Sequence, residues 1–270
     1  ACLWGSTRIG RPVKWVCERS EGHLSDSHDR DQVTEAALAL DGEGRFLAMR
    51  FDNVCGVGAY LGAGAPVSPS NHLGGLAGLY TTPAIYVEAS AVFTNTAPIG
   101  PYRGAGRPEA TFVLERLIDT AAREMGIDRA EIRKRNLIPP SAMPFKTGLT
   151  FTYDCGEFER NMSQALATAD YAGFETRRAE AAARGRLRGI GVANFVEQTG
   201  QADGEVVSLK FDASGCVTVA VGSIPHGQGH ETMYKVIISD RLGIDADEIR
   251  VVTGDTDLVP YGWGTYSSRS

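Results

Sequence analysis

Two segments of the same form constrain the fold of this chain most. Residues 32–53 (QVTEAALALDGEGRFLAMRFDN) and residues 205–223 (EVVSLKFDASGCVTVAVGS) each place alternating apolar residues on both sides of a short Asp/Gly turn. This pattern predicts two β-hairpins, with turns at Asp41–Gly44 and Asp212–Gly215. We therefore expect an α+β chain built from two similar mixed sheet-and-helix domains.

The first domain is predicted to span residues 1–175. Residues 60–80 are rich in Gly, Pro and Ser, which favours a packed loop without a regular element. Residues 84–95 (AIYVEASAVFTN) are typical of a strand. A helix is expected from Pro108 to a stop at Gly126, because proline suits the first turn and glycine the C-terminal cap. The charged run at 129–136 (RAEIRKRN) is interpreted as the solvated side of a further short helix.

The second domain is predicted to span residues 176–270, with the change of domain placed near the end of a predicted helical region at 158–184. Its strand is expected to open in RGRLRGIGVANFVE (184–197), and the order that follows is strand, strand, loop, helix, strand. The helix at 231–242 carries four apolar residues at helical spacing, which predicts one buried face. These are Tyr234, Ile237, Ile238 and Leu242.

Charge and cysteine usage exclude several classes of protein. A net charge of -6 without a basic cluster argues against a nucleic-acid binder. No apolar run is long enough to span a membrane. The five cysteines are scattered, which argues against a zinc or iron–sulfur site and indicates reduced thiols in a cytoplasmic protein. The chain lacks an initiator Met and ends in GWGTYSSRS, so we expect a fragment of a longer protein.

Three glycine loops are the candidate binding sites. Gly104–Gly106 and Gly227–Gly229 each precede a helix, and residues 262–270 form a third loop with hydroxyl groups and an arginine. A helix N-terminus attracts anions, and glycine lets the backbone approach a ligand closely. For any one loop the simpler interpretation is a turn that caps a helix. Three such loops in an acidic chain favour a large phosphorylated or oxo-anionic cofactor.

Motif spacing excludes the commoner cofactor sites. No phosphate-binding G-x-x-x-x-G-K-[ST] sequence is present, and both glycine loops fail the dinucleotide fingerprint at its third glycine. The pair His230-Glu231 lacks the second histidine that a zinc protease motif requires at Tyr234.

Several motifs, in order along the whole chain, resemble the large subunit of molybdenum hydroxylases, the xanthine oxidase, aldehyde oxidase and aerobic carbon monoxide dehydrogenase family. The motifs are GRPVKWVCERSE with HDRD, PYRGAGRPEATFVLERLID, RKRNLIPP, YDCGEFE, and HGQGHET with GDTDLVPYGWGTYSSRS. The resemblance implies a molybdenum–molybdopterin cytosine dinucleotide cofactor. Its expected binding residues lie in three loops: Tyr102, Arg103, Gly104, Ala105 and Gly106; Gln228, Gly229 and His230; and Thr265, Ser267, Ser268, Arg269 and Ser270.

The resemblance also implies the reaction and the partners. The family hydroxylates a small molecule with water as oxygen source and passes electrons to [2Fe-2S] clusters and FAD on a small and a medium subunit, as a dimer of heterotrimers. The pterin holds the metal, so no direct metal ligand is expected. The catalytic glutamate is expected beyond Ser270 or on another chain. The alternative is a non-catalytic cofactor-binding fragment or subunit that needs another chain for activity.

Two small residues of the first loop restrict the substrate. Copper-type carbon monoxide dehydrogenases carry a copper-binding cysteine at the position of Gly104, which glycine cannot replace. Xanthine dehydrogenases carry a purine-stacking aromatic residue at the position of Ala105. The resemblance therefore favours an aldehyde or an N-heterocycle as the substrate.

Overall fold

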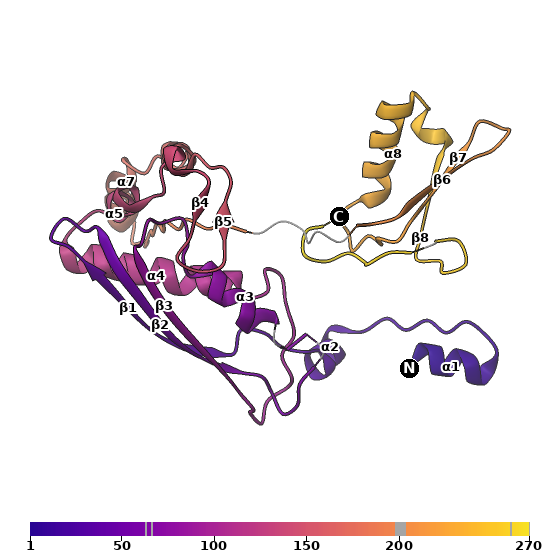
Figure 1. Cartoon of the computed structure of the whole chain (residues 1–270), viewed down its shortest axis with the longest axis horizontal. Helices are drawn as coiled ribbons and strands as arrows, with labels where there is room; N and C mark the ends of the chain where they lie inside the picture. The colour runs from indigo at the N-terminus through magenta and orange to yellow at the C-terminus, as the bar shows by residue number, and fades with distance from the viewer. Residues whose placement is uncertain (63, 66, 198–203, 260, 270) are drawn as a thin grey trace. The chain divides into compact units, whose positions relative to one another are not determined.

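The computed structural model describes residues 1–62, 64–65, 67–197, 204–259 and 261–269 (Figure 1). The chain divides into two compact units, Ala1–Val196 and Glu197–Ser270. This division does not test the predicted domain boundary between residues 175 and 176, which stays a prediction. No helix that the structure describes is long and apolar enough to cross a membrane.

Unit 1 mixes helices with a three-stranded sheet and a two-stranded one. Its elements are α1 (Cys2–Ile9), α2 (Arg19–Ser25), β1 (Gln32–Leu40), β2 (Phe46–Gly56), α3 (Val67–Gly75), β3 (Ala84–Val92), α4 (Arg107–Met125), α5 (Arg129–Asn136), η1 (Pro140–Ala142), β4 (Phe145–Lys146), β5 (Thr152–Tyr153), α6 (Phe158–Thr168) and α7 (Phe174–Ala183).

The main sheet of unit 1 has the order β1-β2-β3. Strands β1 and β2 form the predicted antiparallel hairpin, and β3 pairs with β2 in parallel. The Asp41 carboxylate stabilises the turn because its Oδ1 accepts hydrogen bonds from the backbone N–H groups of Glu43 (2.9 Å) and Arg45 (2.8 Å). The prediction of this hairpin is confirmed.

Helix α4 lies beside the sheet and supplies much of the core of unit 1. Its apolar face buries Leu114 and Ile118, which join Phe51 of β2 and Ile132 of α5 in one cluster. The helix begins after Gly106 and ends at the left-handed Gly126, as its sequence predicts. Through this packing the core fixes the direction in which the N-terminus of α4 points.

Unit 2 is a smaller sheet covered by one helix. Its elements are β6 (Val207–Phe211), β7 (Val217–Val221), α8 (His230–Leu242), η2 (Ala246–Glu248) and β8 (Ile249–Thr253). The predicted order of elements after β6 is confirmed. Tyr234 and Ile238 of α8 pack against the buried valines of β7, whereas Ile237 and Leu242 are about half exposed. The predicted four-residue face therefore buries only two of its members.

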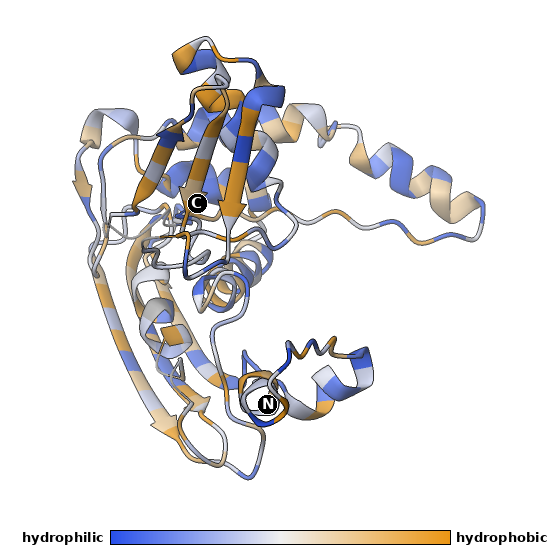
Figure 2. Ribbon diagram, turned by 90° about the vertical axis from the view of Figure 1, so that its right-hand side faces the viewer, coloured by the Kyte–Doolittle hydropathy of each residue, from blue (hydrophilic) through white to orange (hydrophobic). Residues whose placement is uncertain are grey.

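Both units share one topology. In each, an antiparallel hairpin is followed by a helix and then by a strand that pairs in parallel with the second hairpin strand: β1-β2-α3-β3 and β6-β7-α8-β8. Figure 2 shows apolar and polar residues interspersed along these strands. The expectation of an α+β chain with two similar units is confirmed.

Two predicted elements are wrong. Residues 67–75 form helix α3 rather than a loop, since Pro69 lies in its first turn, where a missing N–H costs little. Gly74 and Gly75 then allow close packing: a Cβ would lie 2.4 Å from Thr150 Oγ1 at the first and 2.9 Å from Ala110 Cβ at the second.

Residues 184–197 do not form a strand. Two of its backbone groups bond to side chains, and none of its described residues pairs with a strand. Arg129 Nη1 donates to Ile190 O (3.1 Å), and Asn194 N donates to Glu115 Oε2 (3.0 Å). Residues 184–196 therefore form an irregular segment of unit 1 that side chains of α4 and α5 hold at these two points.

Candidate functional site

The predicted loop of unit 1 has a backbone that few sequences adopt. Gly104, Ala105 and Gly106 all have positive φ angles, of 96°, 44° and 97°. A tight turn closes the loop, with Ala105 N donating to Tyr102 O (2.8 Å) and Arg107 N donating to Gly104 O (3.1 Å). Positive φ at three successive residues explains the glycines, because only glycine adopts it without strain. The turn leads directly into α4.

The loop rests on helix α3. A Cβ on Gly106 would lie 2.1 Å from Ser68 O and 2.8 Å from His72 N, so the two backbones are in contact. The side chain of His72 is fully buried, and burial lowers its pKa to about 4. On α4, burial raises the pKa of the Glu109 carboxyl, whose side chain is 5% exposed. The sequence motifs did not single out Ser68, His72 or Glu109 as part of this site.

In unit 2 the predicted Gln228–His230 loop caps α8. Gly227 and Gly229 have φ angles of 113° and 77°, and Gly229 is the N-cap. Gln228 is exposed, and its side-chain oxygen accepts a hydrogen bond from His226 N. His230 is 2% exposed, and within the described residues neither of its ring nitrogens has a hydrogen-bond partner.

The third predicted loop contacts the chain that leads into the second. Thr265 Oγ1 donates to Ile224 O (2.6 Å), four residues before Gln228 in unit 2. Ser267 and Ser268 are exposed, with φ angles of 52° and 54°. Arg269 is largely buried, and its Nη1 pairs with Glu205 Oε2 at 2.9 Å. Ser270 lies outside the described residues.

The sequence matches two family models, both described as a molybdopterin cofactor-binding domain. They cover residues 1–137, half the chain, and residues 164–270. The chain belongs to the molybdopterin cofactor-binding domain family. Each of the three predicted loops lies inside one of the matched ranges.

Two relatives of this molybdopterin-binding chain are named as parts of dehydrogenases. It is 35% identical to the 6-hydroxypseudooxynicotine dehydrogenase complex subunit gamma of Paenarthrobacter nicotinovorans, over 99% of this chain and 34% of that protein. It is also 35% identical to the carbon monoxide dehydrogenase large chain of Hydrogenophaga pseudoflava, over 97% and 35%. The chain spans about a third of the length of these relatives.

A solved structure has the same fold as this molybdopterin-binding chain. Quinoline 2-oxidoreductase from Pseudomonas putida 86 superposes with a TM-score of 0.87 at 36% identity, covering 98% of this chain and 36% of that one.

The side chain of His230, at the start of helix α8 in unit 2, fits a molybdopterin cofactor. A buried imidazole without a partner is rare in proteins unless a ligand or water supplies one. His230 meets this description at the first position of α8, where the unpaired N–H groups and the helix dipole favour an anion. These features suit a phosphate or a pterin group.

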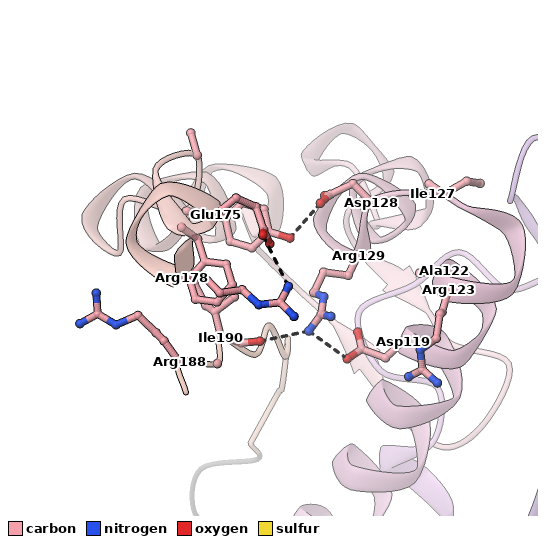
Figure 3. Close-up of a pocket in the computed structure, with 14 residues that line it drawn as sticks. Asp119, Ala122, Arg123, Ile127, Asp128, Arg129, Glu175, Arg178, Arg188 and Ile190 are labelled. Carbon is pink, nitrogen blue, oxygen red and sulfur yellow. Dashed lines mark hydrogen bonds and ion pairs between the residues drawn. The ribbon is translucent and has the colours of Figure 1, made fainter. Parts of the chain in front are cut away.

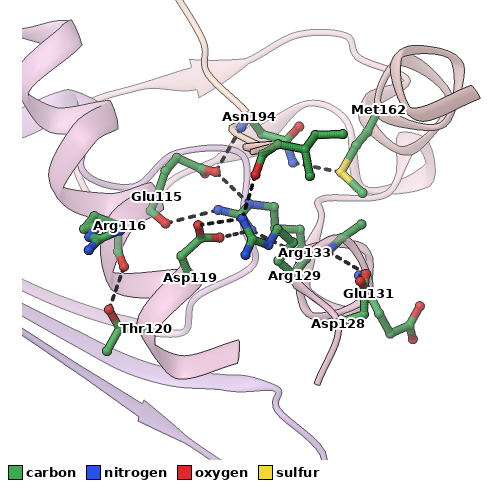
Figure 4. A network of polar contacts seen from close by, with 12 residues as sticks. Glu115, Arg116, Asp119, Thr120, Asp128, Arg129, Glu131, Arg133, Met162 and Asn194 are labelled. Atoms are coloured by element: carbon green, nitrogen blue, oxygen red, sulfur yellow. Dashed lines mark hydrogen bonds and ion pairs between the residues drawn. The ribbon is translucent and has the colours of Figure 1, made fainter. Parts of the chain in front are cut away.

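A buried ionic network joins α4 and α5 (Figure 4). Arg133 is fully buried and bonds Glu115 Oε2 at 2.7 Å and Asp119 Oδ1 at 2.8 Å. Tyr80 Oη donates to Glu115 Oε1 at 2.6 Å. The interpretation of residues 129–136 as a solvated face is therefore wrong for Arg133, because two carboxylates on α4 neutralise its charge inside the core.

A cavity of about 620 Å³ lies between the end of α4 and the α6–α7 turn of this molybdopterin-binding chain (Figure 3). Arginines line it, but two of them already face carboxylates: Arg129 lies 3.7 Å from Asp119, and Arg178 lies 3.5 Å from Glu175. None of the predicted cofactor-binding residues lines this cavity. It therefore adds no residue to the candidate site.

Proposed function

We propose that this chain is the molybdopterin-binding part of the large subunit of a molybdenum hydroxylase. The single observation that carries the proposal is the match of residues 1–137 and 164–270 to molybdopterin cofactor-binding domains. The glycine loop Tyr102–Gly106 at the start of α4 lies inside the first matched range. The names of the relatives, subunits and large chains of dehydrogenases, support catalysis with partner chains over a non-catalytic role.

The expected cofactor is the cytosine dinucleotide form of molybdopterin, and the expected partners carry [2Fe-2S] clusters and FAD in a dimer of heterotrimers. When bound, the cofactor supplies the redox chemistry of hydroxylation. In this proposal the Tyr102–Gly106 loop lies beside the metal, and the Gln228–His230 and Thr265–Ser270 loops bind the pterin and the phosphates. The catalytic glutamate is proposed to lie outside residues 1–270. The cytoplasmic location stays a prediction, supported by five free cysteines.

The loop geometry supports an aldehyde or an N-heterocycle as the substrate. At Gly104 the φ angle is 96°, and a Cβ would lie 2.5 Å from Pro108 Cγ. A copper-binding cysteine at this position would therefore require the Pro108 ring to move. Ala105 presents only a methyl group, which offers no surface for purine stacking. One structural relative is named for quinoline, an N-heterocycle.

Dye reduction by the purified enzyme with its partner subunits tests this function. We expect reduction with quinoline or benzaldehyde and none with carbon monoxide. Protein from tungstate-grown cells, which lacks molybdenum, is the matched control and should be inactive. Molybdenum-loaded protein that oxidises carbon monoxide, or that reduces no dye with any aldehyde or N-heterocycle, would contradict the proposal.

A further inference from the structure

Residues 28–31 (HDRD) lie beside the chain that leads into the Tyr102–Gly106 loop. The backbone of His28 pairs with it on both sides: His28 N donates to Pro98 O (3.0 Å), and Gly100 N donates to His28 O (2.8 Å). This short parallel ladder places the next two residues of the segment against the loop itself.

The Asp29 carboxylate connects the loop to helix α3. Its Oδ2 accepts hydrogen bonds from Tyr102 N (2.9 Å) and from Ser68 Oγ (3.0 Å). Its Oδ1 accepts a third from Arg30 N (2.8 Å). Hydrogen bonds to an ionised acceptor are stronger than those between neutral groups. One side chain thus fixes the first residue of the loop to the helix beneath it.

Arg30 binds the same loop one residue further on. Its Nη2 donates to Arg103 O (2.8 Å), and its guanidinium lies 5.3 Å from the centre of the Tyr102 ring. Its Nε lies 3.6 Å from the buried Glu109 Oε1. The arginine therefore connects the loop to the first turn of α4.

The backbone of Arg30 is itself strained. Its φ angle is 68°, which a residue with a Cβ rarely adopts. Such a conformation persists only where surrounding contacts hold it, and those contacts here are the ones to the loop.

Side-chain burial does not hold the loop in place. The Tyr102 ring is 59% exposed, and Arg103 is exposed as well. The loop also contains three successive residues with positive φ, a conformation that a free chain would leave. Its shape at this end therefore depends on polar contacts to its backbone.

We propose that Asp29 and Arg30 are positioning residues, which hold the backbone of Tyr102–Gly106 in the shape that receives the molybdenum cofactor. This inference rests on the proposed function. It adds two residues that contact the loop and not the cofactor itself.

Limited trypsin digestion of the purified protein tests the holding role, because the bond after Arg103 is the one whose carbonyl Arg30 binds. Digestion is followed by mass spectrometry, with cleavage after the exposed Arg184 as the internal reference. We expect cleavage after Arg103 to accelerate about tenfold in Asp29→Ala and Arg30→Met, since loss of a charged hydrogen bond raises local opening by this order. Asp29→Asn and Arg30→Lys, which keep part of each contact, should show intermediate rates.

Two exposed residues provide matched controls: Asp26→Ala for the aspartate and Arg45→Met for the arginine. Both should cleave after Arg103 at the wild-type rate. Molybdenum retained after gel filtration is measured on the same proteins. Molybdenum retention should be lowest in the variants that are cleaved fastest after Arg103. It should be intermediate in Asp29→Asn and Arg30→Lys.

An unchanged cleavage rate after Arg103 in both Asp29→Ala and Arg30→Met would overturn the inference. Equal acceleration after Arg103 and Arg184 would also overturn it, because it would indicate general loss of structure. Faster cleavage with full retention of molybdenum would overturn the positioning role. Wild-type protein without molybdenum would instead contradict the proposed function, and the cleavage rates would still decide whether the two residues hold the loop.

Discussion

At the scale of single residues, Gly106 is the most constrained position of the predicted cofactor loop. It combines a φ angle of 97° with a Cβ position only 2.1 Å from the backbone oxygen of Ser68. Gly126, at the other end of α4, shares the left-handed backbone, at φ 66°, but nothing lies within 4 Å of its Cβ position. A comparison of the two positions therefore separates the effect of steric contact from the effect of backbone strain.

We predict that Gly106→Ala destabilises the protein by about 3 kcal/mol or more, whereas Gly126→Ala costs only about 1 kcal/mol. The difference arises because α3 must move away from a new methyl group at residue 106. Urea unfolding of both variants measures it. Equal losses of stability would show that α3 and the loop are not in close contact.

His72 makes stability depend on pH. Burial lowers its pKa from 6.5 to about 4, so between these values the unfolded chain holds more protons than the folded one. Folding stability must therefore fall as the pH drops. The contribution of His72 amounts to about 2 kcal/mol between about pH 7.5 and about pH 5.

Urea unfolding at the two pH values, repeated with His72→Asn, tests this dependence. The variant should lose about 2 kcal/mol less than the wild type on acidification. His23→Asn, at an exposed histidine, should behave like the wild type. If the His72→Asn protein lost as much stability as the wild type, His72 would not be the group responsible.

The sequence could predict the loop but not its support. Glycines 104 and 106 stand out because positive φ restricts the residue type. Asp29 and Arg30 lie more than seventy residues earlier, within HDRD, a motif that carried the resemblance without an assigned role. Their contact to the loop depends on a tertiary pairing, between His28 and Ile99, that local pattern does not encode.

At the scale of elements, α4 and α5 are joined by the buried charges of Arg133, Glu115 and Asp119. We predict that Arg133→Met costs about 3–5 kcal/mol, because it leaves two carboxylates without their cation inside the protein. Arg135→Met is the control on the same helix. Its contacts with the Glu131 carboxylate and with Glu43 O are both exposed, so the loss should stay below about 1 kcal/mol.

Urea unfolding compares the two variants. A loss below about 1 kcal/mol for Arg133→Met would show that the buried network contributes little net stability. Arg133 and Arg135 were both assigned to the solvated side of a helix, because the charged run alone does not distinguish a buried arginine from an exposed one. The available signal lay on α4, where Glu115 and Asp119 are one turn apart beside the buried Leu114 and Ile118.

Helix α3 and residues 184–197 show the limits of local pattern at this scale. Glycine and proline favoured a loop at residues 67–75, but tertiary packing against α4 stabilises a helix there. The glycines of this helix allow close contact with neighbouring residues. A strand was also predicted at residues 184–197, yet two of its backbone groups bond to side chains of α4 and α5 instead.

At the scale of the whole molecule, each unit presents a glycine loop at the start of its longest helix. Gly106 caps the 19 residues of α4, and Gly229 caps the 13 residues of α8, both in the left-handed region. Hairpin turns and helix caps made this plan predictable from sequence. The identity of the cofactor came instead from the ordered motifs and the family models, since a glycine loop alone fits any anion.

The molybdenum and pterin content of the purified protein tests the central claim most directly. Metal analysis by mass spectrometry and fluorescence of the oxidised pterin are measured on the same sample. We predict equimolar molybdenum and pterin in the wild-type protein, and less of both in Arg103→Ala, which changes an exposed side chain of the loop and should fold normally. Folded protein that contains neither molybdenum nor pterin, from cells that supply both to another molybdenum hydroxylase, would contradict the account.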